Sequence, residues 1–158
     1  STTSALVLTA VLIALATLFT MYTKIPVPGI RGYFNVGDVV IMTSALLLGR
    51  KYGAYIGAIG PALADLFLGY AVFVPITFVV KGIEGYLVGT VYNNKTTTSA
   101  LAATIVGGII IVAGYFIVEY FVFNPGVAIA SILTNTIQAV MSVIVSMILY
   151  AILRKRLR

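Results

Sequence analysis

The chain contains no cysteine and no histidine. Their absence excludes thiolate catalysis, histidine acid–base chemistry, and zinc or iron–sulfur sites built on these residues. The chain also lacks the G-x-x-x-x-G-K-[ST] motif, so it cannot use ATP through a P-loop of its own. We expect no cofactor and no metal site, and the chain is not predicted to be an enzyme.

Charge is also scarce. Of the 158 residues, 9% are charged and 61% are hydrophobic, and the mean hydropathy is +1.12. A soluble domain carries about 25% charged residues, so most of this surface must face lipid. Five or six spans of about 20 residues would use nearly the whole chain as one domain, residues 1–158. The net charge of +6 comes from basic residues at span ends and does not indicate nucleic-acid binding.

The fold class predicted is an all-α integral membrane protein, a compact bundle of six transmembrane helices. The second span is too short to cross about 30 Å of hydrocarbon upright, so five spans plus a re-entrant segment remain an alternative. Gly60-Pro61 predicts a kink in the third span. The six predicted spans are residues 4–22, 37–48, 52–68, 71–92, 99–120 and 127–153.

The basic residues predict an orientation, because loops rich in Lys and Arg stay in the cytoplasm. In the six-span arrangement only Lys24 and Arg31 fall on the minority side. Both termini are therefore predicted to be cytoplasmic, in a multi-pass protein of a bacterial or archaeal cell membrane. The loop 23–36 and the turns at 69–70 and 124–126 would then face outside. The majority side carries Arg50, Lys51, Lys95, Arg154, Lys155, Arg156 and Arg158.

Lys81 and Glu84 lie three residues apart in the otherwise apolar run 71–91. Ionisable residues inside a membrane face a bundle interior or cavity, and they usually pair or bind something. The two could form a purely structural ion pair, since residues at i and i+3 are neighbours on a helix. Buried pairs stabilise weakly, however, and this favours a functional role. Asp65 could equally bind a ligand or join helices.

Helix geometry places these groups at similar depth. Asp65 lies about 20 Å along the third span, and Lys81 and Glu84 lie about 15 and 20 Å below the outer face. Tyr115 falls in the outer half of the fifth span. One face of the sixth span is polar, which predicts a cavity open to the outside, although Asn135 and Gln138 could also act as interhelical contacts. That face carries Ser131, Thr134, Asn135, Gln138 and Ser142.

Two further acidic residues have simpler interpretations. Asp38 follows Gly37 at a helix start, where an N-cap is the favoured role. Glu119 is near the end of a span and is expected to be solvated. Tyr33 and Phe34 are expected to be interfacial anchors.

Small residues four apart mark where helices approach closely. Gly53 and Gly57 have this spacing in the third span, and Gly85 and Gly89 have it in the fourth. In the first span Ala10 and Ala14 repeat the pattern. Packing within the bundle explains all three, but the first span could equally present its alanine face to another membrane protein.

Three segments carry a family resemblance: YFNVGD at 33–38, GAIGPALADLFLGY at 57–70 and KGIEG at 81–85. They resemble the substrate-binding S components of energy-coupling factor (ECF) vitamin transporters, closest to the hydroxymethylpyrimidine/pyridoxine-type group. The likeness covers nearly the whole chain. It implies high-affinity binding of one vitamin from outside and association with a transmembrane T component and two cytoplasmic ATPase subunits.

The resemblance also implies roles for residues. Ala10 and Ala14 match the face that docks on the T component. The absence of Trp departs from the Trp-lined thiamine binders, and the absence of His disfavours the nickel and cobalt members. The implied substrate site contains Asn35, Asp65, Tyr70, Lys81, Glu84, Tyr115, Asn135 and Gln138.

Other functions stay open at this point. Pyridoxine is the first expectation for the vitamin, by subgroup resemblance alone, and riboflavin is an alternative. The chain could also be a stand-alone secondary carrier or channel that uses Glu84 and Asp65 for protons or ions. A membrane enzyme or an assembly subunit without a ligand is the third class.

Overall fold

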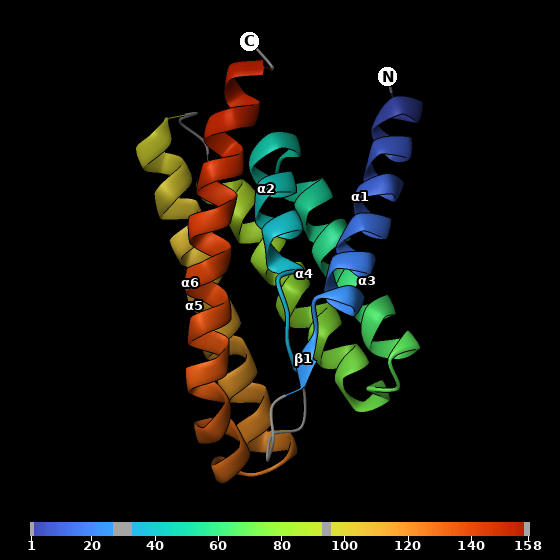
Figure 1. Cartoon of the computed structure of the whole chain (residues 1–158), viewed down its shortest axis with the longest axis vertical. Coiled ribbons are helices and arrows are strands. Elements are labelled where there is room, and N and C mark those ends of the chain that lie inside the picture. Colours follow the sequence, from blue (N-terminus) through green and yellow to red (C-terminus); the bar gives the residue numbers. More distant parts are fainter. Residues whose placement is uncertain (1, 27–32, 93–95, 157–158) are drawn as a thin grey trace.

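The structure is a computed structural model, which describes residues 2–26, 33–92 and 96–156. Within these residues it forms six α-helices, one short 3-10 helix and two strands of two residues each (Figure 1). The elements in chain order are α1 (Thr2–Tyr22), β1 (Ile25–Pro26), β2 (Tyr33–Phe34), α2 (Asp38–Leu48), α3 (Arg50–Phe67), η1 (Ala71–Phe73), α4 (Val74–Val91), α5 (Thr97–Val122) and α6 (Pro125–Arg156).

The helices form a bundle in which α5 and α6 pair on one side and α1 packs against α3 on the other (Figure 1). The short α2 lies in the middle and contacts α3, α4 and α6. Buried apolar side chains such as Met42, Val88 and Ile111 fill the centre. The first turn of α1 and the last turn of α6 lie at the same end of the molecule, as six spans require.

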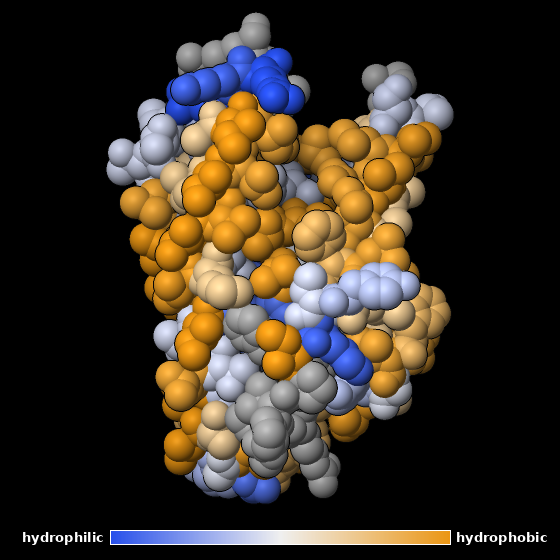
Figure 2. All heavy atoms as spheres, viewed as in Figure 1, coloured by the Kyte–Doolittle hydropathy of each residue, from blue (hydrophilic) through white to orange (hydrophobic). Residues whose placement is uncertain are grey.

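Four segments in the described part of the chain are long and apolar enough to cross a membrane: Thr2–Tyr22, Ala71–Val91, Thr97–Val122 and Pro125–Arg156. The 11-residue α2 is apolar but short, and α3 carries Arg50, Lys51 and Asp65. Large apolar side chains cover the outside of the bundle (Figure 2), which suits a lipid environment. The predicted all-helical membrane fold is therefore confirmed, with four of its six helices apolar enough to span.

The predicted helix boundaries differ from the observed ones by a few residues. The third span was predicted from residue 52, but Arg50 and Lys51 already belong to α3, and Gly49, at φ +93°, is the one residue between α2 and α3. The α3 helix continues through Pro61. Thr17 of α1 donates a hydrogen bond of 2.9 Å to the Gly60 carbonyl, which ties α1 to this part of α3.

The glycine spacing of the third and fourth spans is confirmed as a helix contact. A Cβ added to Gly53 would lie 2.6 Å from the Gly85 carbonyl oxygen. A Cβ on Gly57 would likewise meet the Lys81 carbonyl, and one on Gly89 would meet the Arg50 backbone. The backbones of α3 and α4 therefore touch along this seam, and no side chain larger than hydrogen fits at these positions.

Residues 23–36, predicted as a loop, contain a short antiparallel pairing of Ile25 with Phe34 and Pro26 with Tyr33. Thr23 Oγ1 accepts a hydrogen bond of 3.1 Å from the Val36 amide. The side chains of Tyr33 and Phe34 lie outside the described part, as do Arg31, Lys95 and Arg158. The roles predicted for those five residues remain predictions.

Candidate functional site

A buried polar cluster joins three helices near the middle of the bundle. Lys81 of α4 forms an ion pair with Asp38, the first residue of α2, through Nζ and Oδ1. Gln138 of α6 donates from Nε2 to the other Asp38 oxygen, Oδ2, at 2.5 Å. The exposed fractions of Asp38, Lys81 and Gln138 are 1%, 3% and 4%. We call Asp38, Lys81, Glu84 and Gln138 the central cluster.

The role predicted for Asp38 was wrong. Gly37 occupies the N-cap position of α2, and no side chain caps that helix end. The N-cap argument assumes a helix that starts near water, whereas α2 starts inside the bundle, where a carboxylate needs a cation. The clue in the sequence was a lone acidic residue at the edge of an apolar helix.

Asn35 fastens the segment before α2 to the central cluster. Its backbone amide donates to Gln138 Oε1 at 3.1 Å, and its side-chain Oδ1 accepts from the Gly37 amide at 2.8 Å. Gln138 therefore uses both ends of its amide, one on α2 and one on the preceding segment. The structure places Asn35 beside Gln138, 103 positions away in the sequence.

Glu84 is the member of the cluster that is least satisfied. Its side chain is fully buried, and its Oε2 lies 3.9 Å from Lys81 Nζ. Neither carboxylate oxygen has a hydrogen-bond partner among the described residues. Lys81 is the only cation within 4.0 Å of Glu84 in the described chain, and Asp38 holds it more closely. The cluster can thus accept hydrogen bonds, or a positive charge, from a bound molecule.

A second polar group adjoins the first. Thr77 donates from Oγ1 to Asp65 Oδ2 at 2.5 Å, and the same hydroxyl lies 3.0 Å from the Tyr115 hydroxyl. Lys81 Nζ lies 5.5 Å from the centre of the Tyr115 ring, within the range of a cation–π contact. Asp65, Thr77, Tyr115 and Lys81 therefore form a continuous polar path across α3, α4 and α5.

Known proteins are similar to this chain in sequence and in fold. A family model described as "ECF-type riboflavin transporter, S component" matches residues 1–155. The chain belongs to this S-component family. The resemblance stated from the sequence is thereby confirmed.

Relatives of this S component include an uncharacterized protein from Pyrococcus woesei, 41% identical over 144 residues, or 89% of this chain and 95% of that protein. Another is the thiamine precursor transporter HmpT of Lactococcus lactis subsp. cremoris (strain MG1363). HmpT is 30% identical over 149 residues, or 93% of this chain and 83% of HmpT. A solved structure described as the S component of a bacterial ECF transporter superposes with a TM-score of 0.81. It is 20% identical and covers 100% of this chain and 99% of that one.

Membership fixes the class of the molecule. The S component is a multi-pass cell-membrane protein of a vitamin uptake system, and its family is one of transporter components, not of enzymes. Family membership implies association with a T component and ATPase subunits.

Thr77 was missed by sequence reasoning. A threonine inside a helix needs no partner elsewhere, because its hydroxyl can donate to a carbonyl of the preceding turn. A threonine in a span therefore does not by itself indicate a binding site. Its spacing was the available clue, since Thr77, Lys81 and Glu84 are four and three residues apart and share one face of α4.

Tyr70 contacts the Asp65 backbone, and Asn135 is one helical turn from Gln138. The Tyr70 amide donates to the Asp65 carbonyl at 2.8 Å, and its ring lies 5.3 Å from Lys24 Nζ. The side chains of Tyr70 and Asn135 are half-buried. Asn135 lies three residues before Gln138 on the same face of α6, as the periodicity predicted.

Glu119 was expected to be solvated, and this was wrong: its exposed fraction is 3%. The α6 helix begins at Pro125, three residues after α5 ends at Val122, and its first turns cover the end of α5. Ser131 of α6 is also buried. Glu119 Oε2 has no hydrogen-bond partner in the described residues.

Proposed function

We propose that this S component binds a small hydroxylated heterocycle, pyridoxine or a hydroxymethylpyrimidine-like vitamin, at the central cluster. The observation that carries the proposal is Glu84, a fully buried carboxylate whose two oxygens lack hydrogen-bond partners among the described residues. A buried acceptor left unpaired costs about 1–3 kcal/mol, and more when it is charged. A ligand that supplies hydrogen-bond donors removes that cost.

The chemistry of the neighbouring residues favours a flat ring with polar substituents. A ring hydroxyl, an exocyclic amine or a protonated ring nitrogen can donate to Glu84. The Tyr115 ring offers an aromatic surface beside Lys81. The similarity to HmpT, named a thiamine precursor transporter, supports a small pyrimidine as the ligand. Asn35, Asp65, Tyr70, Asn135 and Gln138 complete the proposed substrate site.

Uptake is proposed to use other subunits, because the sequence has no P-loop motif. The partners are a T component and two cytoplasmic ATPases. In this proposal both termini face the cytoplasm, and the ligand enters from the opposite side. Ala10 and Ala14, which are exposed on α1, dock on the T component.

Riboflavin is the second candidate, because the matching family model is described as a riboflavin transporter component. Its ring system is larger, so it needs more room between α4, α5 and α6 than the smaller vitamins. A stand-alone carrier that moves ions through Asp65 and Glu84 is the third candidate.

The test is to identify the small molecule that leaves the purified protein on denaturation, by mass spectrometry, and then to titrate the ligand-free protein by calorimetry. We expect one pyridoxine-like or pyrimidine molecule per chain and tighter binding of that compound than of riboflavin. Tighter riboflavin binding would replace the proposed vitamin. Ion-driven flux in liposomes containing this chain alone, with no vitamin bound, would overturn the proposal.

A further inference from the structure

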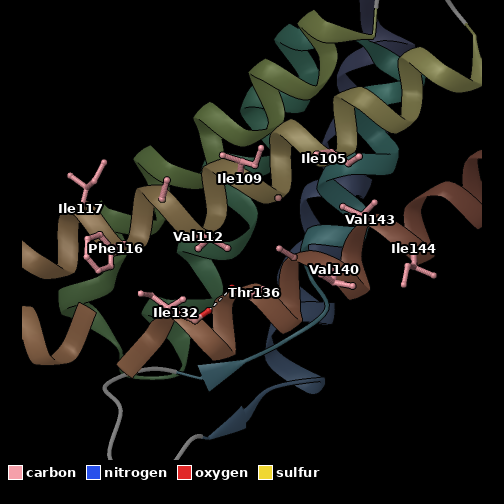
Figure 3. Close-up of a pocket in the computed structure, with 13 residues that line it drawn as sticks. Ile105, Ile109, Val112, Phe116, Ile117, Ile132, Thr136, Val140, Val143 and Ile144 are labelled. Atoms are coloured by element: carbon pink, nitrogen blue, oxygen red, sulfur yellow. Dashed lines mark hydrogen bonds between the residues drawn. The ribbon is translucent and has the colours of Figure 1, made fainter. Parts of the chain in front are cut away.

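The lipid-facing seam between α5 and α6 contains an open apolar groove of about 770 Å³ (Figure 3). Ile105, Ile109 and Phe116 of α5 form one wall, and Val140 and Ile144 of α6 form the other. Thr136 contributes the lining's only hydroxyl among the described residues, and that hydroxyl donates to the Ile132 carbonyl at 2.7 Å. The groove therefore offers an occupant almost nothing but hydrocarbon.

A second hollow, of about 250 Å³, lies on the same two helices nearer the chain termini. Arg154 and Lys155 line it together with Thr97, Met147 and Tyr150. Arg154 donates to Thr97 Oγ1 at 3.1 Å, and its guanidinium lies 5.7 Å from the centre of the Tyr150 ring. These contacts hold Arg154 in place at the hollow, with the ammonium of Lys155 beside it.

The helical register makes the two hollows parts of one track. On α6, Val140, Ile144, Met147 and Ala151 follow one another at spacings of three or four residues, so they share a face. From Arg154 to Ile144 is about 15 Å along the helix, close to the hydrocarbon depth of one leaflet. Figure 2 shows hydrophilic atoms at the terminal end of α6 above an apolar surface.

We propose that an anionic phospholipid occupies this track, with its phosphate between Arg154 and Lys155 and one acyl chain running along α6 into the groove. The occupant must have an apolar body and an anionic group at one end, which is the chemistry of such a lipid. It belongs to the leaflet on the side of the chain termini. This site is separate from the central cluster and does not depend on the proposed vitamin.

Charge also argues against a second copy of this chain as the occupant. The sequence has four acidic residues, and Asp38, Asp65, Glu84 and Glu119 are all buried, with exposed fractions of 3% or less. A second copy therefore has no exposed acidic side chain to place against Arg154 and Lys155. The headgroup of an acidic lipid supplies the missing charge.

The experiment counts lipids retained by the purified full chain in native mass spectrometry. The probes are phosphatidylglycerol and phosphatidylcholine with identical acyl chains, and glycerol 3-phosphate as the headgroup anion alone. We expect one phosphatidylglycerol to be retained in preference to phosphatidylcholine. The double variant Arg154→Gln with Lys155→Gln should weaken its retention about thirtyfold. Arg156→Gln, which removes a positive charge outside the hollow, should leave the retention unchanged.

The groove is tested separately by Val140→Phe, which fills it, against Val145→Phe, an exposed valine of the same helix outside the groove. We expect only Val140→Phe to reduce phosphatidylglycerol retention, and Ile105→Phe on the facing wall serves if that variant does not fold. Equal retention of both lipids would overturn the proposal. So would glycerol 3-phosphate binding as tightly as the lipid, or a dimer or T-component complex lost in Val140→Phe with lipid retention unchanged.

Discussion

Glu84 carries the strongest prediction for a single residue. Replacing it with Gln keeps the shape but removes the charge that strengthens hydrogen bonds from the ligand. We expect Glu84→Gln to weaken vitamin binding at least about tenfold, since 1.4 kcal/mol is one decade. Calorimetry on the folded, ligand-free variant measures this change.

The matched control is Glu119→Gln, because Glu119 is also a buried acid with an unpartnered oxygen but lies outside the central cluster. Its affinity for the vitamin should stay at the level of the unchanged protein. Equal affinities for all three proteins would remove Glu84 from the site.

The ion pair of Asp38 with Lys81 gives a prediction about stability. Lys81→Met leaves the carboxylates of Asp38 and Glu84 buried without a cation, and breaking a buried pair from one side costs about 3–5 kcal/mol. The melting temperature in detergent should therefore fall. Adding Asp38→Asn should restore part of it, because Gln138 can still donate to the new amide oxygen. A double variant no more stable than Lys81→Met would show that the pair does not hold α2 in place.

Sequence reasoning found some of these residues and not others, for physical reasons. Lys81, Glu84 and Gln138 are conspicuous because a polar side chain inside an apolar helix has few structural explanations. Asp38 stands at a helix boundary, where a carboxylate is ordinary, so its partner could be known only from the packing of α2 against α4 and α6. The contact between Asn35 and Gln138 depends on the same packing.

Among the helices, the α3–α4 seam makes the sharpest prediction. Alanine stabilises a helix by about 1 kcal/mol relative to glycine, but at Gly85 its methyl group would collide with the Gly53 backbone. We therefore expect Gly85→Ala to lower the melting temperature in detergent. The control is Gly108→Ala, whose added Cβ would sit 3.4 Å from Ala139 Cβ, an ordinary contact. An unchanged melting temperature for Gly85→Ala would mean that α3 and α4 can move apart at this position without a loss of stability.

The exposed face of α1 makes a prediction about assembly. Thr9, Ala16, Thr17 and Thr20 form its buried face, and Ala10 and Ala14 are exposed. Leucine at Ala10 or Ala14 would keep a partner helix at a distance. We expect either substitution to abolish uptake and T-component pull-down while vitamin affinity stays unchanged. Ala102→Leu, at an exposed alanine of α5, is the control, and wild-type pull-down by both α1 variants would contradict the docking role.

The helices themselves were accessible from the sequence, because long apolar runs broken by Gly, Pro and Asn leave few alternatives. The β1–β2 pairing was not, since strands of two residues are too short to show an alternating pattern. Nor could apolar periodicity find the groove between α5 and α6, because it depends on how far apart two lipid-facing helices lie.

At the scale of the whole molecule, orientation is the prediction to test. Arg50, Lys51 and the basic end of α6 predict that their side is cytoplasmic. The chain has no natural cysteine, so single cysteines can report sidedness directly. We expect Lys24→Cys to react with an impermeant thiol reagent on intact cells and Lys51→Cys to react only after permeabilisation. The reverse pattern would invert the molecule and move the ligand entrance to the cytoplasmic side.

The membrane class followed from composition alone, because a chain with 9% charged residues cannot cover a water-facing surface. The arrangement of helices around the central cluster did not follow from it. Hydropathy describes each span separately, whereas the site depends on which spans become neighbours and at what height.

The backbone contact between α3 and α4 has a mechanical consequence. At the glycine positions the two backbones touch directly, with no side chain there that could rotate or slide, so the two helices behave as one rigid body. Lys81 and Glu84 belong to this α3–α4 unit, whereas Gln138 belongs to the α5–α6 pair. Asp38 contacts both Lys81 and Gln138, and Asn35 is bonded to Gln138. A movement that admits or releases a molecule at the cluster must open this boundary. That movement has to break the hydrogen bond that Gln138 donates to Asp38 and the one that the Asn35 amide donates to Gln138.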